Sequence, residues 1–142
     1  IANDKPVTLR IYPCLVLRNT YLEKLYRNGQ YKPLDVEEAA IWSGKILNRA
    51  TKKGLKVQRI GLQETDSLKE SVIAGPHHPA LGEMARSEAL ALFLTSKAKL
   101  GPWQIPKNRI SLVSGHENFG LRILSSITGL EEEEVLERIS FI

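Results

Sequence analysis

Hydrophobic positions in the first half of the chain follow two periods, and together they predict one strand–helix–helix–strand unit. Val7–Tyr12 is rich in β-forming residues, and Pro13 ends or bends this run before the apolar segment Cys14–Leu17. Lys56–Leu62 is a second run of this kind. Because more than 35 residues separate the two runs, they are predicted to pair in parallel through a right-handed crossover.

Two helices are predicted between these strands. Thr20 provides an N-cap for a helix over Tyr21–Asn28. Asp35 and Glu38 have the spacing of a capping box at the start of a longer helix, which Gly54 ends. The positions expected to face the core of that helix repeat at helical spacing: Val36, Ala39, Ala40, Ser43, Ile46, Leu47 and Ala50.

The second half of the chain has a different pattern, with mostly helical periodicity. The predicted elements are helices over Ser67–Ile73, Ala80–Lys99, Phe119–Ile127 and Leu130–Arg138, the last with Thr128 and Glu131 at capping-box spacing, and short strands over Arg109–Ser114 and Ile139–Ile142. The predicted fold class is therefore α/β, with a strand–helix–strand unit over residues 1–66. A mostly helical α+β extension follows over residues 67–142.

Composition narrows the range of functions. Hydrophobic residues make up 42% of the 142 residues, which is enough for a packed core. The single cysteine, Cys14, excludes a disulfide framework and a cysteine-rich metal site held by this chain alone, so we expect it to be a small buried hydrophobe. Trp42 and Trp103 are expected to be packing residues. No run of 18 apolar residues exists, so we expect no membrane partner and a cytoplasmic location.

The charge is uneven along the chain. Residues 1–75 contain 13 Lys and Arg against 8 Asp and Glu, whereas residues 76–142 contain 7 against 8. A basic half permits contact with phosphates, so RNA is a candidate partner, although solubilising surface lysines give the same balance. The pair of helices over Phe119–Arg138 resembles a helix-turn-helix, but Glu131–Glu134 at the start of its second helix would repel DNA. We therefore expect no DNA partner.

Polar side chains at the strand ends are the first candidate site residues. Alternation along the second strand puts Arg59, Gly61 and Gln63 on one side, at the sheet edge where α/β proteins bind ligands. Arg59 is either a buried charge that needs an anionic ligand or an arginine that reaches solvent at the sheet edge. Tyr12 and Arg18 flank the end of the first strand, and the alternative for Arg18 is an exposed residue beside a turn.

A stiff Gly-Pro-His-His-Pro turn, ending at Pro79, is the second candidate. His77 and His78 lie just before a predicted helix start, where backbone N–H groups favour an anion and imidazole binds one or moves a proton. The alternative is a polar loop with two ordinary histidines. With Glu83 the pair suggests a metal, but the spacing matches no established ligand motif. No metal ligands are therefore assigned.

Three stretches resemble a known family. Tyr12-Pro13-Cys14-Leu15-Val16, running into Arg18-Asn19-Thr20, resembles the late barrel region of radical-SAM enzymes related to the elongator catalytic subunit. Val57–Gln63 resembles their final barrel strand, and Val72–Glu83 resembles a stretch in their bacterial members. The resemblance covers roughly residues 7–95. Similar chains are loosely grouped with oxygen-independent coproporphyrinogen oxidases.

The resemblance implies a (β/α) barrel, a [4Fe–4S] cluster and S-adenosylmethionine, whose reductive cleavage gives a radical that abstracts hydrogen from the substrate. The three-cysteine loop that holds such a cluster is absent from these residues. We therefore expect a C-terminal fragment that is inactive alone, has no catalytic residues of its own and has the upstream barrel as its partner. The resemblance then assigns Arg59 and Gln63 to the cofactor, and Tyr12, Arg18, His77 and His78 to the substrate.

Other functions remain open at this point. A coproporphyrinogen III oxidase-like radical-SAM protein is one, and a non-catalytic α/β module that binds an anion or a partner at Gly75–Pro79 is another. An independent small enzyme with a histidine base is a third, but it lacks a recognisable nucleophile.

Overall fold

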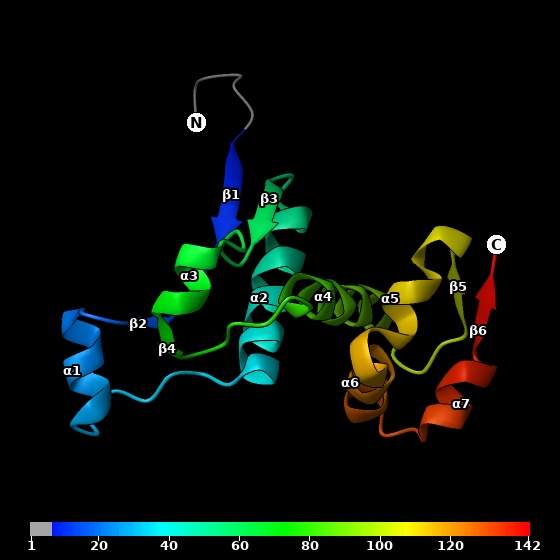
Figure 1. The fold of residues 1–142 in the computed structure, drawn as a ribbon. Helices are drawn as coiled ribbons and strands as arrows, with labels where there is room; N and C mark the ends of the chain where they lie inside the picture. Colours follow the sequence, from blue (N-terminus) through cyan, green and yellow to red (C-terminus); the bar gives the residue numbers. More distant parts are fainter. Residues whose placement is uncertain (1–6) are drawn as a thin grey trace.

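The computed structural model describes residues 7–142. Figure 1 shows the order of its elements. They are β1 (Thr8–Ile11), β2 (Val16–Leu17), α1 (Tyr21–Arg27), α2 (Val36–Lys52), β3 (Lys56–Ile60), α3 (Asp66–Ser71), β4 (Val72–Ala74), α4 (Leu81–Lys97), β5 (Trp103–Ile105), η1 (Lys107–Arg109), α5 (Ile110–Ser114), η2 (His116–Asn118), α6 (Phe119–Thr128), α7 (Glu132–Glu137) and β6 (Ile139–Phe141).

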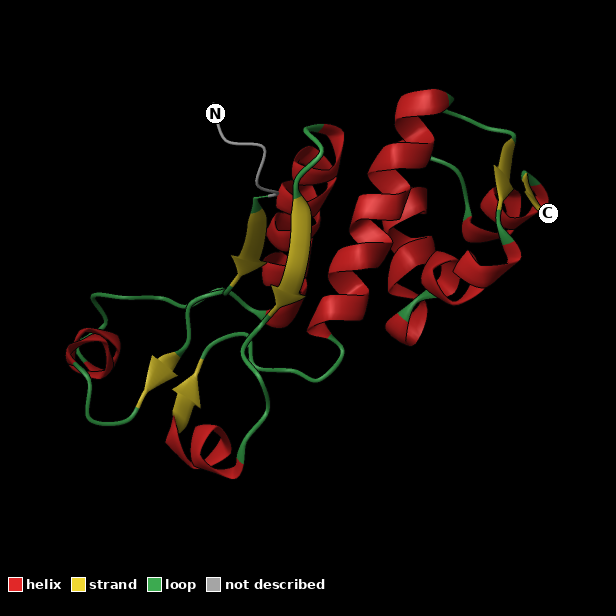
Figure 2. Ribbon diagram, turned by 90° about the horizontal axis from the view of Figure 1, so that it is seen from above, coloured by secondary structure: helices red, strands yellow, loops and turns green. Residues whose placement is uncertain are grey.

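The parallel pairing of the first strand–helix–strand unit is confirmed. β1 pairs in parallel with β3, and the register shifts by one residue between Leu9 and Arg10. α2 packs on one face of this pair (Figure 2), so Ile11 is buried and Leu9 is half-buried. α2 begins as predicted, because the Asp35 side chain accepts a hydrogen bond from the Glu38 backbone N–H.

A second, antiparallel pair was not predicted. β2 pairs with β4, and the residues of β4 fall at the end of the predicted helix over Ser67–Ile73. The helical part, α3, ends at Ser71, because the β-branched residues Val72 and Ile73 favour the extended backbone. Arg18 follows β2 rather than the first strand, so its predicted position at the carboxyl end of β1 is wrong.

α4 joins two hydrophobic cores. Its first half packs with α2 and α6 in a cluster that includes Leu81, Met84 and Phe119. Its second half supplies Ala91 and Leu94 to the other cluster, with residues from β5, α5, α6 and α7. α2 and α4 pack against each other (Figure 1), and Gly44 of α2 lies close to Ala85 and Glu88 of α4.

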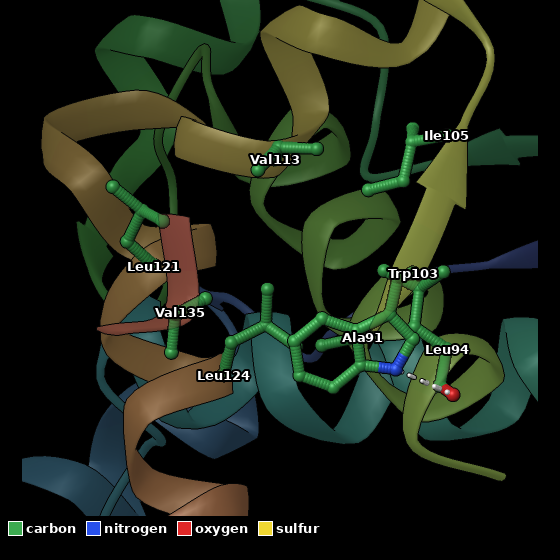
Figure 3. Packing of buried hydrophobic residues seen from close by; sticks show 8 residues of the cluster. All are labelled: Ala91, Leu94, Trp103, Ile105, Val113, Leu121, Leu124 and Val135. Carbon is green, nitrogen blue, oxygen red and sulfur yellow. Dashed lines mark hydrogen bonds between the residues drawn. The ribbon is translucent and has the colours of Figure 1, made fainter. Parts of the chain in front are cut away.

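In the C-terminal part, buried hydrophobic residues pack in a cluster that includes Trp103 (Figure 3). Its indole Nε1–H donates to the Leu94 carbonyl oxygen at 3.1 Å, as Figure 3 shows. It also donates to the Ala98 carbonyl oxygen at 2.8 Å. β5 pairs in parallel with β6, and the predicted closing strand is thereby confirmed. The predicted strand over Arg109–Ser114 is wrong, because this segment forms η1 and α5. Short apolar runs do not distinguish a strand from a helix by periodicity.

Four expectations about single side chains are also corrected. Cys14 is exposed rather than a buried hydrophobe, and Trp42 and Ile46 leave 58% and 46% of their surface exposed on α2. Trp103 is a packing residue, as expected. The capping box of α7 joins Glu131 to Glu134 and does not involve Thr128.

Across residues 7–142, none of the helices has the length and hydrophobicity of a membrane-spanning segment.

Candidate functional site

The face of the β1–β3 pair that α2 does not cover carries polar side chains. Arg10 and Tyr12 are exposed on β1 and directly after it, and Arg59 is the cross-strand neighbour of Arg10. The Arg10 Nε–H donates to the Gln58 side-chain oxygen at 3.3 Å. Two arginines therefore lie on one open surface.

A cavity of ≈ 550 Å³ lies between this face and α3. Arg10, Tyr12, Arg59 and Gln63 all border it. Its other lining residues are Leu17, Leu62, Thr65, Ser67, Leu68 and Ser71, so no carboxylate side chain borders it. Two guanidiniums without an acidic neighbour make this cavity suited to a carboxylate or a phosphate.

Strand alternation does not place Gln63. β3 ends at Ile60, and Gly61 has a φ of +82°, which turns the chain away from the strand direction. The prediction that Arg59, Gly61 and Gln63 share a side by alternation is therefore wrong, although Gln63 still reaches the same cavity as Arg59. Arg59 is exposed, so it is not a buried charge.

A second cavity, of ≈ 260 Å³, lies between the end of β3 and the Gly75–Pro79 turn. Arg59, His77 and His78 border it, with Glu64. Gly75 has a φ of +111°, and a Cβ there would lie 3.1 Å from the Cys14 carbonyl oxygen and from the Leu15 Cα. Glycine is thus required where this turn crosses the Pro13–Leu17 segment.

Hydrogen bonds fix both histidine rings. The His77 Nε2 lies 2.9 Å from a carboxylate oxygen of Glu64. The His78 Nδ1 accepts a hydrogen bond from the Ala80 backbone N–H at 3.0 Å, so the neutral ring carries its proton on Nε2. The His116 ring, from the C-terminal part, packs edge-on against His78 with centroids 5.0 Å apart. All three histidines of the chain therefore gather at one rim.

The structure brings together five of the six predicted site residues. Tyr12 and Gln63 share one cavity, His77 and His78 share the other, and Arg59 borders both. Arg18 borders neither of these two cavities, because β2 carries it away. Their roles toward a cofactor or substrate remain predictions.

Sequence reasoning missed three residues of this region. Arg10 lies two positions before Tyr12, so strand alternation would have placed the two side chains on one face. Glu64 and His116 gave no comparable signal, because their contacts with His77 and His78 depend on how loops meet in the folded chain.

The cluster that the resemblance implies does not fit these residues. A [4Fe–4S] cluster is held by several cysteine thiolates, and the chain has only Cys14, which lines neither of these cavities. Within residues 7–142 no three His, Cys, Asp or Glu side chains are grouped to hold a metal ion. S-adenosylmethionine has a carboxylate, which the two arginines are suited to bind.

The parallel β1–β3 unit, its crossover helix and the cavities at its strand ends define a mixed α/β protein. The radical-SAM C-terminal domain family matches residues 6–91, and the chain belongs to that family. The match includes every predicted site residue and ends within α4, so His116 lies outside it.

One curated relative is similar over a short stretch. It is the tRNA uridine(34) acetyltransferase of Methanocaldococcus jannaschii, which is 49% identical over 35 residues. These residues are 25% of this chain and 6% of the relative, so the chain spans only a small part of that protein's length. No solved structure matches the chain. The family match and this relative together confirm the resemblance to the elongator type of radical-SAM protein.

Proposed function

We propose that this chain supplies the last strands of a radical-SAM enzyme that modifies RNA. The observation that supports this most is the open face of β1–β3, where Arg10 and Arg59 border a cavity without carboxylates. Family membership supports the enzyme class, and the name of the archaeal relative supports RNA as the substrate.

Under this proposal the residues of the chain bind and orient rather than react. S-adenosylmethionine, when bound, supplies the radical chemistry. Arg59 and Gln63 would hold this cofactor, with Arg59 suited to its carboxylate, and Arg10 would add a second guanidinium. Tyr12, His77, His78 and Arg18 contact the substrate. The cluster is held by another part of the same protein, so the 142 residues alone are inactive.

Binding of S-adenosylmethionine to the native enzyme tests the cofactor assignment. Losing a charge-assisted hydrogen bond costs about 1.5–3 kcal/mol, so Arg59→Ala should weaken binding roughly 10- to 150-fold in calorimetry. Arg59→Lys should also weaken binding, because an ammonium does not bind a carboxylate through two parallel hydrogen bonds. The control is Arg109→Ala, at an exposed arginine on η1. Equal affinity in all four proteins would refute the assignment.

A non-catalytic anion-binding module is the second candidate, favoured by the smaller cavity at the Gly75–Pro79 turn. Arg59, His77 and His78 border it, and α4 begins there without a side-chain cap. The native protein distinguishes the two functions. A longer product that carries an iron–sulfur cluster after purification without oxygen supports the enzyme, whereas a product of 15.9 kDa that binds phosphate without a cluster supports the module.

A further inference from the structure

The outer face of α2 is unusual, because its large apolar residues point to solvent. The inner face buries small residues, namely Ala39, Ala40, Ser43, Gly44 and Ala50. Trp42 and Ile46 lie beside this buried strip and leave 58% and 46% of their surface exposed. The helix thus packs on α4 through its small side chains and presents its largest ones outward.

Basic side chains surround this exposed tryptophan. Lys45, Arg49, Lys52 and Lys53 follow it at helical spacing and border a shallow cavity of ≈ 700 Å³ together with Trp42. The remaining lining residues are Ile46, Asn48 and Leu92, so no acidic side chain borders this cavity. Among residues 7–142, none of these four cations forms an ion pair.

The Trp42 ring is held in place by its neighbour. The Lys45 ammonium lies 5.0 Å from the centre of the indole, within the range of a cation–π contact. The Lys45 ammonium thus lies over one face of this exposed ring, beside a row of positive charges. We name the Trp42, Lys45, Arg49, Lys52 and Lys53 side chains the α2 basic face.

We propose that the α2 basic face binds an RNA strand, with one unpaired base stacked on Trp42 and phosphates along the cations. This inference rests on the proposed function for the choice of RNA. The charge row fits a polyanion, and a flat aromatic ring beside it fits a base, which a lipid headgroup or an acidic peptide does not offer. The two cavities that Arg59 borders lie on other elements. Under this proposal the α2 basic face therefore binds the RNA at a distance from those cavities.

Fluorescence anisotropy with a labelled RNA stem–loop tests this surface on the full chain. Base–aromatic stacking is worth about 1–3 kcal/mol, so Trp42→Ala should weaken binding roughly 5- to 150-fold, and Trp42→Phe should restore most of it. Inorganic polyphosphate, which has no bases, should bind both tryptophan variants equally. Thermal unfolding checks that each variant is folded, and the exposure of Trp42 makes a loss of folding unexpected.

Salt dependence tests the cations separately. Each phosphate contact contributes about −0.7 to the slope of log affinity against log salt for a single strand. Arg49→Gln with Lys52→Gln should therefore reduce the slope by about 1.4. Lys99→Gln with Lys107→Gln, at two exposed lysines outside this face, removes the same charge and should leave the slope unchanged.

Protection of Trp42 provides a direct readout. Trp103 is only 3% exposed, so iodide in solution quenches chiefly Trp42, and bound RNA should reduce that quenching. Wild-type affinity in Trp42→Ala, or an equal loss in the two charge variants, would overturn the proposal. Binding to phosphatidylserine vesicles without binding to RNA would overturn it in favour of a membrane. RNA binding on this face in a protein without radical chemistry would refute the proposed function and leave this inference standing.

Discussion

At the residue scale, Gly75 sets the shape of the histidine turn. Its φ of +111° and its contacts with Cys14 and Leu15 leave no room for a Cβ. Gly75→Ala should lower the free energy of unfolding by about 1–3 kcal/mol, measured by urea denaturation. Gly29→Ala, at φ +73° with nothing within 4 Å, is the matched control and should lose only about 1 kcal/mol from backbone strain. Equal losses would mean that the close approach at Gly75 is unimportant.

Glu88 is the second residue whose environment predicts a measurable effect. Its side chain is buried, its Oε2 has no hydrogen-bond partner, and burial raises the pKa of its carboxyl above the ordinary value, although Lys45 opposes this. The folded state therefore holds a proton that the unfolded chain releases, so stability falls as pH rises above the ordinary carboxyl pKa.

Glu88→Gln should remove this loss. Near pH 4, where the carboxyl is protonated in both states, the variant and the wild type should have similar free energies of unfolding. At pH 8 the variant should be more stable by about 1–3 kcal/mol. Glu83→Gln, at an exposed position of the same helix, is the control. If the free energies of unfolding of Glu88→Gln and the wild type changed with pH in the same way, the buried carboxylate would not destabilise the folded state.

At the scale of elements, the α2–α4 contact depends on Gly44. A Cβ at this position would lie 2.5 Å from the Glu88 side chain and 2.6 Å from the Ala85 carbonyl oxygen. Gly44→Ala should therefore destabilise by about 1–3 kcal/mol through overpacking, although alanine normally favours a helix. Gly82→Ala on α4 meets the movable Arg86 side chain at 3.0 Å and the Ile60 carbonyl oxygen at an ordinary contact distance of 3.8 Å, so it should be neutral or stabilising. Calorimetric melting temperatures decide the sign for each variant.

The same scale shows how far the sequence predicts this fold. The long helices were predictable, because caps such as Asp35 and a helical repeat of apolar positions are local signals. β6 was predicted, but β2, β4 and β5 contain only two or three residues each, which leave no periodic pattern to recognise. Ile46 fits the helical repeat of the core, yet it stays exposed with Trp42, because α4 approaches α2 closely at the small residue Gly44.

At the scale of the whole molecule, the candidate site was predictable only in part. Arg59 lies on a predicted strand and the two histidines precede a predicted helix, and the structure places them around adjoining cavities. Arg18 does not border these cavities, because the antiparallel β2–β4 pair directs the chain away from them after Pro13. The contact between His78 and His116 joins segments nearly 40 residues apart, and no local pattern encodes such a meeting.

The shared helix α4 also determines how the molecule unfolds. One core contains Leu81 and Met84, the other contains Ala91 and Leu94, and Ile123 packs against both. Loss of one core therefore removes packing from the helix that supports the other. Leu124→Ala, at a residue only 2% exposed, should cost about 2–5 kcal/mol. Because the cores are coupled, it should lower the unfolding midpoint reported by Trp103 fluorescence and by amide exchange in α2 to the same extent. If α2 kept its wild-type protection while Trp103 became exposed, the residues before and after α4 would be separate folding units, as the predicted division at residue 66 implies.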